Sequence, residues 1–370
     1  MNDSLFGIPN LDIYLVLGIL VGFGLLETAA GYLRHSKRRR ADWLQEVTSF
    51  FALSLLIKPL IVLTVLALGA AVFPEVANTL QATPLWLSLL AFILVDDLLQ
   101  YWYHRSAHEY PFLWKLHRTH HQAEEMGFFV SYRNAALYYL LMPNIWWVGI
   151  YTFLGGGVAV AIGLVAKQAI IISSHSRVPY DRLFHRHAWL RPIGRMWERI
   201  FITPAFHHAH HGQSRRDGIS DPNGNFGNML SIWDQLFGTA SFPQAYPPAY
   251  GLENDPKEPW TTAYLYPLLR ADDPGSELAR GFQKPDTRTT DAVTVRLEAG
   301  QRYLYCTCGK SKQAPFCDSS HHGSKYKPTL FVAQRTGPHR MCNCKLTGTA
   351  PFCDGTHQAF TALPLPVPKR

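Results

Sequence analysis

The stretch "PLWLSLLAFILVDDLLQYWYHRSAH", residues 84–108, decides the fold, because an apolar segment runs directly into a pair of histidines. Residues 84–103 are long enough to cross a bilayer core of ~30 Å as a helix that rises ~1.5 Å per residue. His104 and His108 are spaced i, i+4, so both side chains lie on one face of that helix. The stretch therefore predicts a membrane-spanning helix that ends in a candidate pair of metal ligands.

Further apolar segments occupy residues 11–33, 48–73, 136–156 and 157–174. Lys58-Pro59 interrupts the second of them, and we interpret the last two, joined at the glycines 155–157, as a hairpin. The basic run "RHSKRRR", 34–40, directly follows the first segment, which favours a cytoplasmic membrane flank over a nucleic-acid patch. Counting crossings from this run places residues 104–135 and everything after 175 in the cytoplasm. The competing interpretation is a soluble helical protein, which segments this long and uncharged disfavour.

Two further histidine clusters, "HRTHH" and "HHAHH", follow the first along the chain. In both, three histidines have the spacing i, i+3, i+4, which places side chains on one face of a helix. The three clusters together supply His104, His108, His117, His120, His121, His207, His210 and His211. Eight imidazoles exceed the three or four protein ligands of a zinc site, and they suit two metal ions that each keep an open position. A tag or a set of surface histidines is the alternative, which the matched spacing and the shared side of the membrane disfavour.

Residues 85–270 resemble the fatty acid hydroxylase / sterol desaturase superfamily of membrane di-iron oxygenases. The family pattern HxxxH, HxxHH and HxxHH appears here in that order, and "DLLQYWYHR", "FLWKLHRTHH" and "NFGNMLSIWDQLFGT" match its flanks. The resemblance implies that the eight histidines hold two iron ions that react with O₂. It adds His175, at the end of the expected hairpin, as a ninth ligand.

The resemblance also separates the ligands from neighbouring residues. Phe206 stands where many relatives have a further histidine, and we leave His208 out of the ligand set. His185 and His187 fit none of the three histidine motifs in the family pattern. Asp97 lies seven residues before His104 on the same helical face, so its carboxylate could accept a hydrogen bond from a ligand imidazole. A polar residue at a water-lined helix end is the other interpretation of Asp97.

All six cysteines fall in two copies of one motif, "CTCGKSKQAPFCDSSH" and "CNCKLTGTAPFCDGTH". The first copy offers Cys306, Cys308, Cys317 and His321, and the second offers Cys342, Cys344, Cys353 and His357. The chain begins without the basic region of a secretory signal, so we expect a reducing compartment and metal-bound thiols. Three thiolates and one imidazole suit either zinc or an iron–sulfur cluster, and the spacing alone leaves both open.

The cysteine repeat resembles the CDGSH iron–sulfur domain. Both copies retain the Ser or Thr, the Pro and the Asp of that family's pattern CxCxx[ST]xxxPxCDGxH. The resemblance implies two [2Fe–2S] clusters, each held by three cysteines and one histidine. The first copy departs from the pattern at Ser319, where the family has glycine. We expect the tight turn there to be strained, but no ligand is lost.

The predicted fold is thus mainly α, with a multi-pass helical membrane domain, a cytoplasmic histidine-rich cap and a small β-rich C-terminal domain. We divide the chain into N-terminal transmembrane helices (1–83), a histidine-box domain (84–270), a linker (271–300) and the tandem iron–sulfur domain (301–370). The linker is predicted from "ADDPGSELARGFQKPDTRTTD", 271–291, and "VTVRLEA" and "RYLYCTC" beyond it are strand-like.

Together the two halves predict an oxidoreductase, namely an O₂-dependent di-iron lipid hydroxylase or desaturase with its own [2Fe–2S] electron-transfer module. Both reactions begin with the same hydrogen abstraction, so both stay open. The expected partners are a membrane lipid and an NAD(P)H-dependent reductase or ferredoxin-type donor, in a bacterial inner membrane rather than the endoplasmic reticulum, and nucleic acid is not among them. The alternatives are a membrane iron–sulfur carrier or sensor with structural zinc in the histidine boxes, and a metal-dependent lipid hydrolase.

Overall fold

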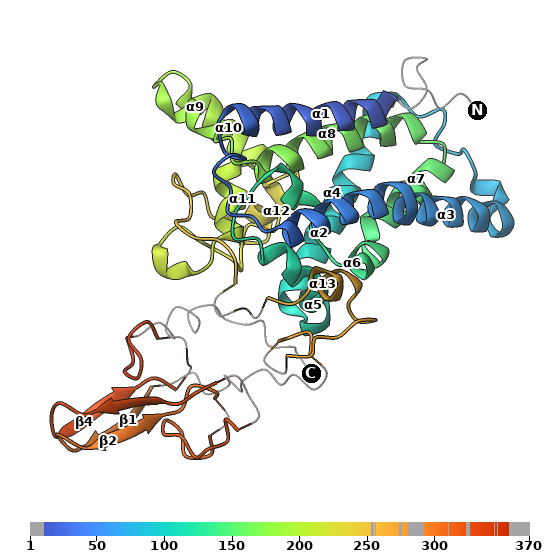
Figure 1. Ribbon diagram of the computed structural model, residues 1–370. Helices are drawn as coiled ribbons and strands as arrows, with labels where there is room; N and C mark the ends of the chain where they lie inside the picture. The colour runs from blue at the N-terminus through green and yellow to red at the C-terminus, as the bar shows by residue number, and fades with distance from the viewer. Residues whose placement is uncertain are drawn as a thin grey trace. The chain divides into compact units, whose positions relative to one another are not determined.

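The computed structural model describes residues 11–252, 255, 257–273, 276–279, 292–309, 311–322, 326–343, 345 and 347–354. The chain forms two compact units, Met1–Arg270 and Ala271–Arg370. The first unit is helical, and the described strands all lie in the second (Figure 1). The prediction of a mainly α protein with a small β-rich C-terminal part is confirmed.

Four helices are long and apolar enough to cross a membrane. They are α1 (Leu11–Ala29), the continuous helix Arg40–Val72, α4 (Leu85–Glu109) and α8 (Gly157–His175). Their outer faces carry large exposed apolar side chains such as Leu25, Leu55 and Leu63, as expected of helices that contact lipid. These spans correspond to four of the five apolar segments in the sequence.

The helix Arg40–Val72 is longer and less broken than we expected. It consists of α2 (Arg40–Ala52), a π-helical turn (Leu53–Ile57) and α3 (Lys58–Val72). In a regular α-helix the ring of Pro59 would clash with the carbonyl group four residues earlier. The wider π-helical turn just before the proline accommodates the ring. Lys58-Pro59 therefore changes the local winding without interrupting the helix.

The expected hairpin is present, but its first leg is not one long helix. It consists of α6 (Ala136–Leu141) and α7 (Pro143–Phe153), separated at Met142 before a proline, while α8 forms the returning leg. The turn between the legs lies against the α3–α4 connection, where the Leu80 N–H donates to the Leu154 carbonyl at 2.8 Å. Gly155 adopts φ +95°, and a Cβ atom there would lie 2.9 Å from the Asn78 Cα atom, so this close approach requires glycine. Helix α7 leads away from the histidine clusters, and α8 leads back to them and ends at His175.

Short helices carry most of the remaining histidines of the first unit. Of these, α5 (Pro111–His121) and α11 (Pro204–His211) both begin with a proline, whose missing N–H costs nothing at a helix start. Thr203 caps α11 by accepting a hydrogen bond from the Phe206 N–H. The other short helices are α9 (Asp181–Arg186), α10 (Arg191–Ile200), α12 (Ile232–Leu236) and α13 (Trp260–Leu265).

The second unit contains two antiparallel strand pairs. Strand β1 (Val293–Leu297) pairs with β4 (Gly337–Met341), and β2 (Arg302–Tyr305) pairs with β3 (Thr329–Val332). The strand-like segments that we identified in the sequence are therefore confirmed as β1 and β2. The small core of this unit consists of Leu297, Tyr305, Ala333, Met341 and Cys342.

Candidate metal centres

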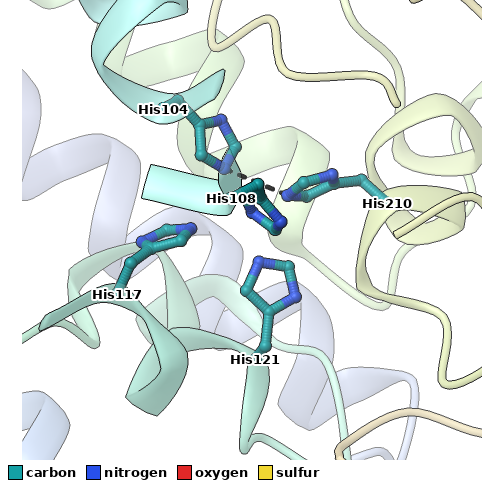
Figure 2. A group of neighbouring side chains, drawn as sticks. All are labelled: His104, His108, His117, His121 and His210. Atoms are coloured by element: carbon teal, nitrogen blue, oxygen red, sulfur yellow. Dashed lines mark hydrogen bonds between the residues drawn. The ribbon is translucent and has the colours of Figure 1, made fainter. Parts of the chain in front are cut away.

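The structure brings five histidines from three helices into one buried group, which we call the first cluster. Figure 2 shows their rings pointing toward one another, and the potential ligand atoms all lie within 4.8 Å of each other. Helices α4, α5 and α11 supply these side chains. The members are His104, His108, His117, His121 and His210.

Four more histidines form the second cluster, again with their potential ligand atoms within 4.8 Å of one another. Its members are His120, His175, His207 and His211, and all four are buried. His175 Nε2 lies 2.9 Å from His207 Nε2 and 3.3 Å from His120 Nε2. His211 Nε2 lies 3.2 Å from His207 Nε2. All nine histidines that we predicted as ligands of the two iron ions therefore fall in one of the two clusters.

Helices α5 and α11 each contribute to both clusters. In α5, His117 and His121 point into the first cluster and His120 into the second. In α11 the order is reversed, because His207 and His211 belong to the second cluster and His210 to the first. In both helices the two histidines spaced i, i+4 thus belong to one cluster, while the histidine at i+3 belongs to the other.

The hydrogen bonds around the first cluster show that its residues fit a metal ion. His104 Nδ1 donates to the Phe226 carbonyl and His210 Nδ1 to the Gly224 carbonyl, both at 2.7 Å. Each Nε2 atom then carries only a lone pair, yet the two Nε2 atoms lie 3.0 Å apart. Two buried acceptors this close repel each other unless a cation lies between them. A metal ion meets this need with neutral imidazoles.

Burial keeps these imidazoles neutral. Desolvation lowers the pKa of His117, His121 and His210 well below the usual value, and the neighbouring histidines lower it further. Protonation is therefore a poor alternative to a metal ion inside the clusters. The buried Nε2 atoms of His117 and His121 have no hydrogen-bond partner, as expected of atoms that are free to coordinate.

In the first cysteine motif the four predicted ligands form two separate pairs. Cys306 Sγ lies 3.6 Å from Cys308 Sγ, and Cys317 Sγ lies 3.1 Å from His321 Nδ1. Burial alone would raise the pKa of the Cys306 thiol, but hydrogen bonds from the backbone of Ser311 and from Cys308 lower it, which favours the thiolate. The first motif thus offers two pairs of candidate metal-binding atoms.

The second motif repeats the local structure of the first wherever it is described. The Cys306 N–H donates to the Pro315 carbonyl, and the Cys342 N–H donates to the Pro351 carbonyl, both at 2.9 Å. The hydroxyl groups of Ser311 and Thr347 donate to the carbonyls of Phe316 and Phe352, both at 2.6 Å. The predicted ligands Cys344 and His357 lie outside the described residues.

Residues 89–239 match the sequence model of the fatty acid hydroxylase family, and residues 281–322 match that of the iron-binding zinc finger CDGSH type. The helical unit contains a fatty acid hydroxylase domain. A CDGSH-type domain follows it in the same chain, so both resemblances found in the sequence hold.

Known relatives match one or the other domain. Alkylglycerol monooxygenase of Danio rerio is 29% identical over 183 residues, which cover 49% of this chain and 36% of that protein. Ornithine lipid hydroxylase OlsE of Rhizobium tropici is 28% identical over 158 residues, which cover 42% of each chain. CDGSH iron-sulfur domain-containing protein 3, mitochondrial, of Homo sapiens is 41% identical over 70 residues, which cover 17% of this chain and 55% of that protein. The chain thus spans about a third to about half of the length of these relatives.

Asp97 holds a loop of the hydroxylase domain and does not contact an imidazole as we predicted. Its carboxylate contacts no imidazole but accepts hydrogen bonds from the backbone N–H groups of Met229 and Leu230 and from Trp233 Nε1, at 3.0–3.1 Å. The same loop provides the Phe226 carbonyl that accepts from His104. The periodicity correctly placed Asp97 on the face of His104, but a loop distant in sequence occupies the space between them.

Two further polar residues support the first cluster, Asn134 by direct contact with a ring and Asp234 through the backbone of the loop at Phe226, and we did not identify either from the sequence. Asn134 Oδ1 accepts a hydrogen bond from His117 Nδ1 at 2.8 Å. Asp234 accepts from the N–H groups of Phe226 and Gly227, both at 2.7 Å, and burial raises its pKa to about 6. Asp234 lies within the family-like stretch "NFGNMLSIWDQLFGT", which could have identified it, whereas Asn134 has no such pattern around it.

The remaining histidines that we left out of the ligand set lie outside both clusters. His208 is buried, and its ring bonds to the Tyr250 hydroxyl at 2.9 Å and donates to the Ser176 carbonyl at 3.1 Å. His185 bonds to Glu198 at 2.8 Å, and His187 packs against Trp189. The structure thus agrees with leaving His208 out of the ligand set that the resemblance implied.

A cavity of about 110 Å³ borders both clusters from the side of the long helices. His104 and His117 of the first cluster and His120 and His175 of the second line its wall. The cavity continues between α4, α7 and α8 past apolar side chains such as Ile145. The other lining residues are Leu53, Lys58, Gln100, Ser131, Tyr132, Asn134, Tyr138, Tyr139, Met142, Asn144, Val148, Leu164, Lys167, Gln168, Ile171 and Asn228.

Substitution of Asn134 tests the support of the first cluster. We expect Asn134→Leu to weaken metal binding there roughly 10- to 100-fold, because His117 loses the acceptor that fixes its ring. Competition with a metal chelator measures the change. Asn134→Asp retains an acceptor oxygen and serves as the control. Equal metal affinity in the two variants would show that this hydrogen bond does not position His117.

Replacement of Ser319 tests the strained turn of the first cysteine motif. Ser319 adopts φ +71°, which confirms the strain expected at this position. We expect Ser319→Gly to raise the free energy of unfolding of the second unit by about 1 kcal/mol, because glycine adopts left-handed backbone angles without steric cost. Differential scanning calorimetry measures the change, with Ser320→Gly as the control, which we expect to be neutral or destabilising.

Proposed function

We propose that this chain is an O₂-dependent membrane lipid hydroxylase or desaturase with a di-iron centre and a fused [2Fe–2S] electron-transfer module. The observation that carries the proposal is the pair of adjacent buried histidine clusters bordering a cavity between helices that could span a membrane. The hydroxylase family match and two lipid-oxidising relatives support the same class of reaction.

In this proposal each cluster holds one iron ion. The first ion would bind to His104, His108, His117, His121 and His210, and the second to His120, His175, His207 and His211. The bound iron would supply the reaction of O₂ with an unactivated C–H bond. The second cluster offers four candidate ligands and the first offers five.

The protein itself orients the ligand rings and keeps water away. Backbone carbonyls hold the Nδ1–H groups of His104, His210 and His175, so their Nε2 atoms face the clusters. The walls of the cavity include Ile145, Val148 and Ile171, which favour an alkyl chain over water. A substrate entering between the long helices would reach both clusters without passing through the aqueous phase.

The second unit provides a candidate source of electrons. Each turnover of such an oxygenase requires two electrons, and the two CDGSH-type motifs would offer two [2Fe–2S] clusters on the same chain. We propose an NAD(P)H-dependent reductase or a ferredoxin-type protein as the donor. We also propose that the clusters and the histidine sites face the cytoplasm, in a bacterial inner membrane.

Metal analysis together with O₂ consumption tests the function. We expect the purified protein to contain about two iron ions beyond the cluster iron and to consume O₂ when a reductant and membrane lipid are present. Zinc in the histidine clusters and no O₂ consumption would favour the alternative of an iron–sulfur carrier or sensor with structural zinc. Lipid hydrolysis without O₂ consumption would favour a hydrolase.

A further inference from the structure

Residues 181–200, which contain α9, α10 and the turn between them, form a surface segment that we call the arginine helix pair. The segment follows α8, which ends at His175, after a short connection. In this connection Arg177 donates a hydrogen bond to the Tyr32 carbonyl, just beyond the end of α1, at 3.4 Å. The arginine helix pair therefore lies next to the ends of two candidate membrane spans.

The exposed charge of the arginine helix pair is entirely positive. Its two acids, Asp181 and Glu198, are buried. Asp181 accepts hydrogen bonds from the Ala205 N–H and the Tyr246 hydroxyl, and Glu198 bonds to His185. All arginines of the segment are exposed, and they are Arg182, Arg186, Arg191, Arg195 and Arg199. A surface of this kind favours a partner with negative charge.

Helix α10 buries one narrow face and exposes an apolar one. Gly194 packs against Phe184 of α9, where a Cβ atom at position 194 would lie 2.4 Å from the Phe184 Cβ atom. Glu198, one turn later, is also buried. The exposed face carries apolar residues at the spacing i, i+3, i+7, namely Ile193, Met196 and Ile200. An apolar stripe beside a row of arginines is typical of a helix that lies along a membrane surface.

The apolar surface continues from α10 across α12 to α4. Gln235 of α12 donates to the Arg199 carbonyl at 2.7 Å, and the next residue, Leu236, is 67% exposed. The Phe237 ring after it lies 4.8 Å, between centroids, from the ring of Trp102. Trp102 is exposed at the end of the apolar part of α4, and tryptophan is enriched where a membrane helix reaches the lipid headgroups. The stripe on α10 is thus continuous with the surface that contacts lipid.

We propose that α10 and the turn before it lie in the headgroup layer of the bilayer and bind anionic lipids. The apolar stripe would contact the acyl chains, while the arginines would extend to the lipid phosphates. Trp189 in the turn is 70% exposed and would lie at the same level. A nucleic acid or an acidic protein would bind the arginines but leave the apolar stripe in water. The proposal concerns the membrane contact of the first unit and is independent of the reaction at the histidine clusters.

The fluorescence of Trp189 tests the depth of the segment. The full-length protein is placed in nanodiscs of phosphatidylglycerol and phosphatidylcholine, with or without bromine near the glycerol end of the acyl chains. The emission lost in Trp189→Phe gives the contribution of Trp189 in each lipid. We expect bromine to reduce this contribution at least roughly twofold, because it quenches indole at short range. Trp260→Phe is the control, since Trp260 lines a polar cavity with Asp255 and Glu258 and should give the same contribution in both lipids.

Bromine on only one of the two lipids tests the arginines. Per molecule, brominated phosphatidylglycerol should quench Trp189 roughly fivefold more than brominated phosphatidylcholine, because positive charge enriches the anionic lipid locally. The double variant Arg191→Gln/Arg195→Gln should lower this ratio close to one. Arg296→Gln/Arg302→Gln removes the same charge from exposed strand positions of the second unit and should retain the native ratio.

A Trp189 contribution that bromine leaves unchanged would overturn the proposal. Quenching by iodide in the aqueous phase would then show that the segment faces water, whereas protection from both quenchers would show that a protein surface covers it. Equal quenching by the two brominated lipids, or an equal loss of selectivity in the two double variants, would contradict anionic-lipid binding by these arginines. None of these measurements depends on iron or O₂, so failure of the proposed function would leave their outcome unaffected.

Discussion

Replacing His210 or His211 by alanine will remove metal from different sites, although the two residues are neighbours in α11. His210 belongs to the first cluster and His211 to the second. Each variant should lose about one iron ion per chain and at least roughly 100-fold in O₂-dependent turnover, because loss of a direct ligand should exceed the 10- to 100-fold effect typical of outer-shell changes. Iron content and the Mössbauer spectrum of the remaining iron measure which site is lost.

His208 provides the matched control for these variants. It lies in the same short helix and is equally buried, but its ring bonds to Tyr250 and Ser176. His208→Ala should retain both iron ions, even if its thermal stability falls. Loss of iron from His208→Ala, or retention of both ions by His210→Ala, would contradict the ligand sets that we propose.

Replacing Cys306 by serine will separate electron supply from oxidation if the second unit relays electrons. We expect Cys306→Ser to lose its cluster and to slow turnover with the physiological reductant at least roughly 100-fold, because serine does not provide a thiolate. Turnover with a small chemical reductant that reaches the histidine-bound iron directly should be largely retained. Cluster absorbance and O₂ consumption with each reductant are the two measurements.

Cys342→Ser extends the test to the second motif, and Thr307→Ala serves as the control within the first. Thr307 stands between two predicted ligands, but its hydroxyl donates to the Lys327 carbonyl and not to a cysteine. Undiminished turnover of both serine variants with the physiological reductant would rule out the relay. Slow turnover with both kinds of reductant would instead indicate damage to the hydroxylase domain.

The order and spacing of the histidines identified eight of the nine side chains that the structure gathers into the two clusters, and the family resemblance added the ninth, His175. Spacing alone did not show which residue joins which cluster. An i, i+3, i+4 pattern fixes a helix face, but the choice between two neighbouring sites depends on how α5 and α11 lie against each other. That arrangement involves residues far apart in the sequence.

The same limit explains the misplaced role of Asp97 and the details of the membrane helices. Helical periodicity correctly placed Asp97 on the side of His104, but only the folded chain shows that residues 226–233 lie between them. Hydropathy found the long helices because their lipid-facing sides are apolar along the whole length. It did not reveal the π-helical turn before Pro59 or the break between α6 and α7, since both are local adjustments to proline.

Because α5 and α11 each contribute histidines to both clusters, their movements are coupled. If both clusters hold a metal ion, each helix would be bound to both ions, so a displacement at one site would also act on the other. A sliding or rolling motion of α11 would stretch bonds at one site and compress them at the other. Helices α5 and α11 would then fix the distance between the two metal sites. That distance would stay constant while flexible segments elsewhere in the chain move.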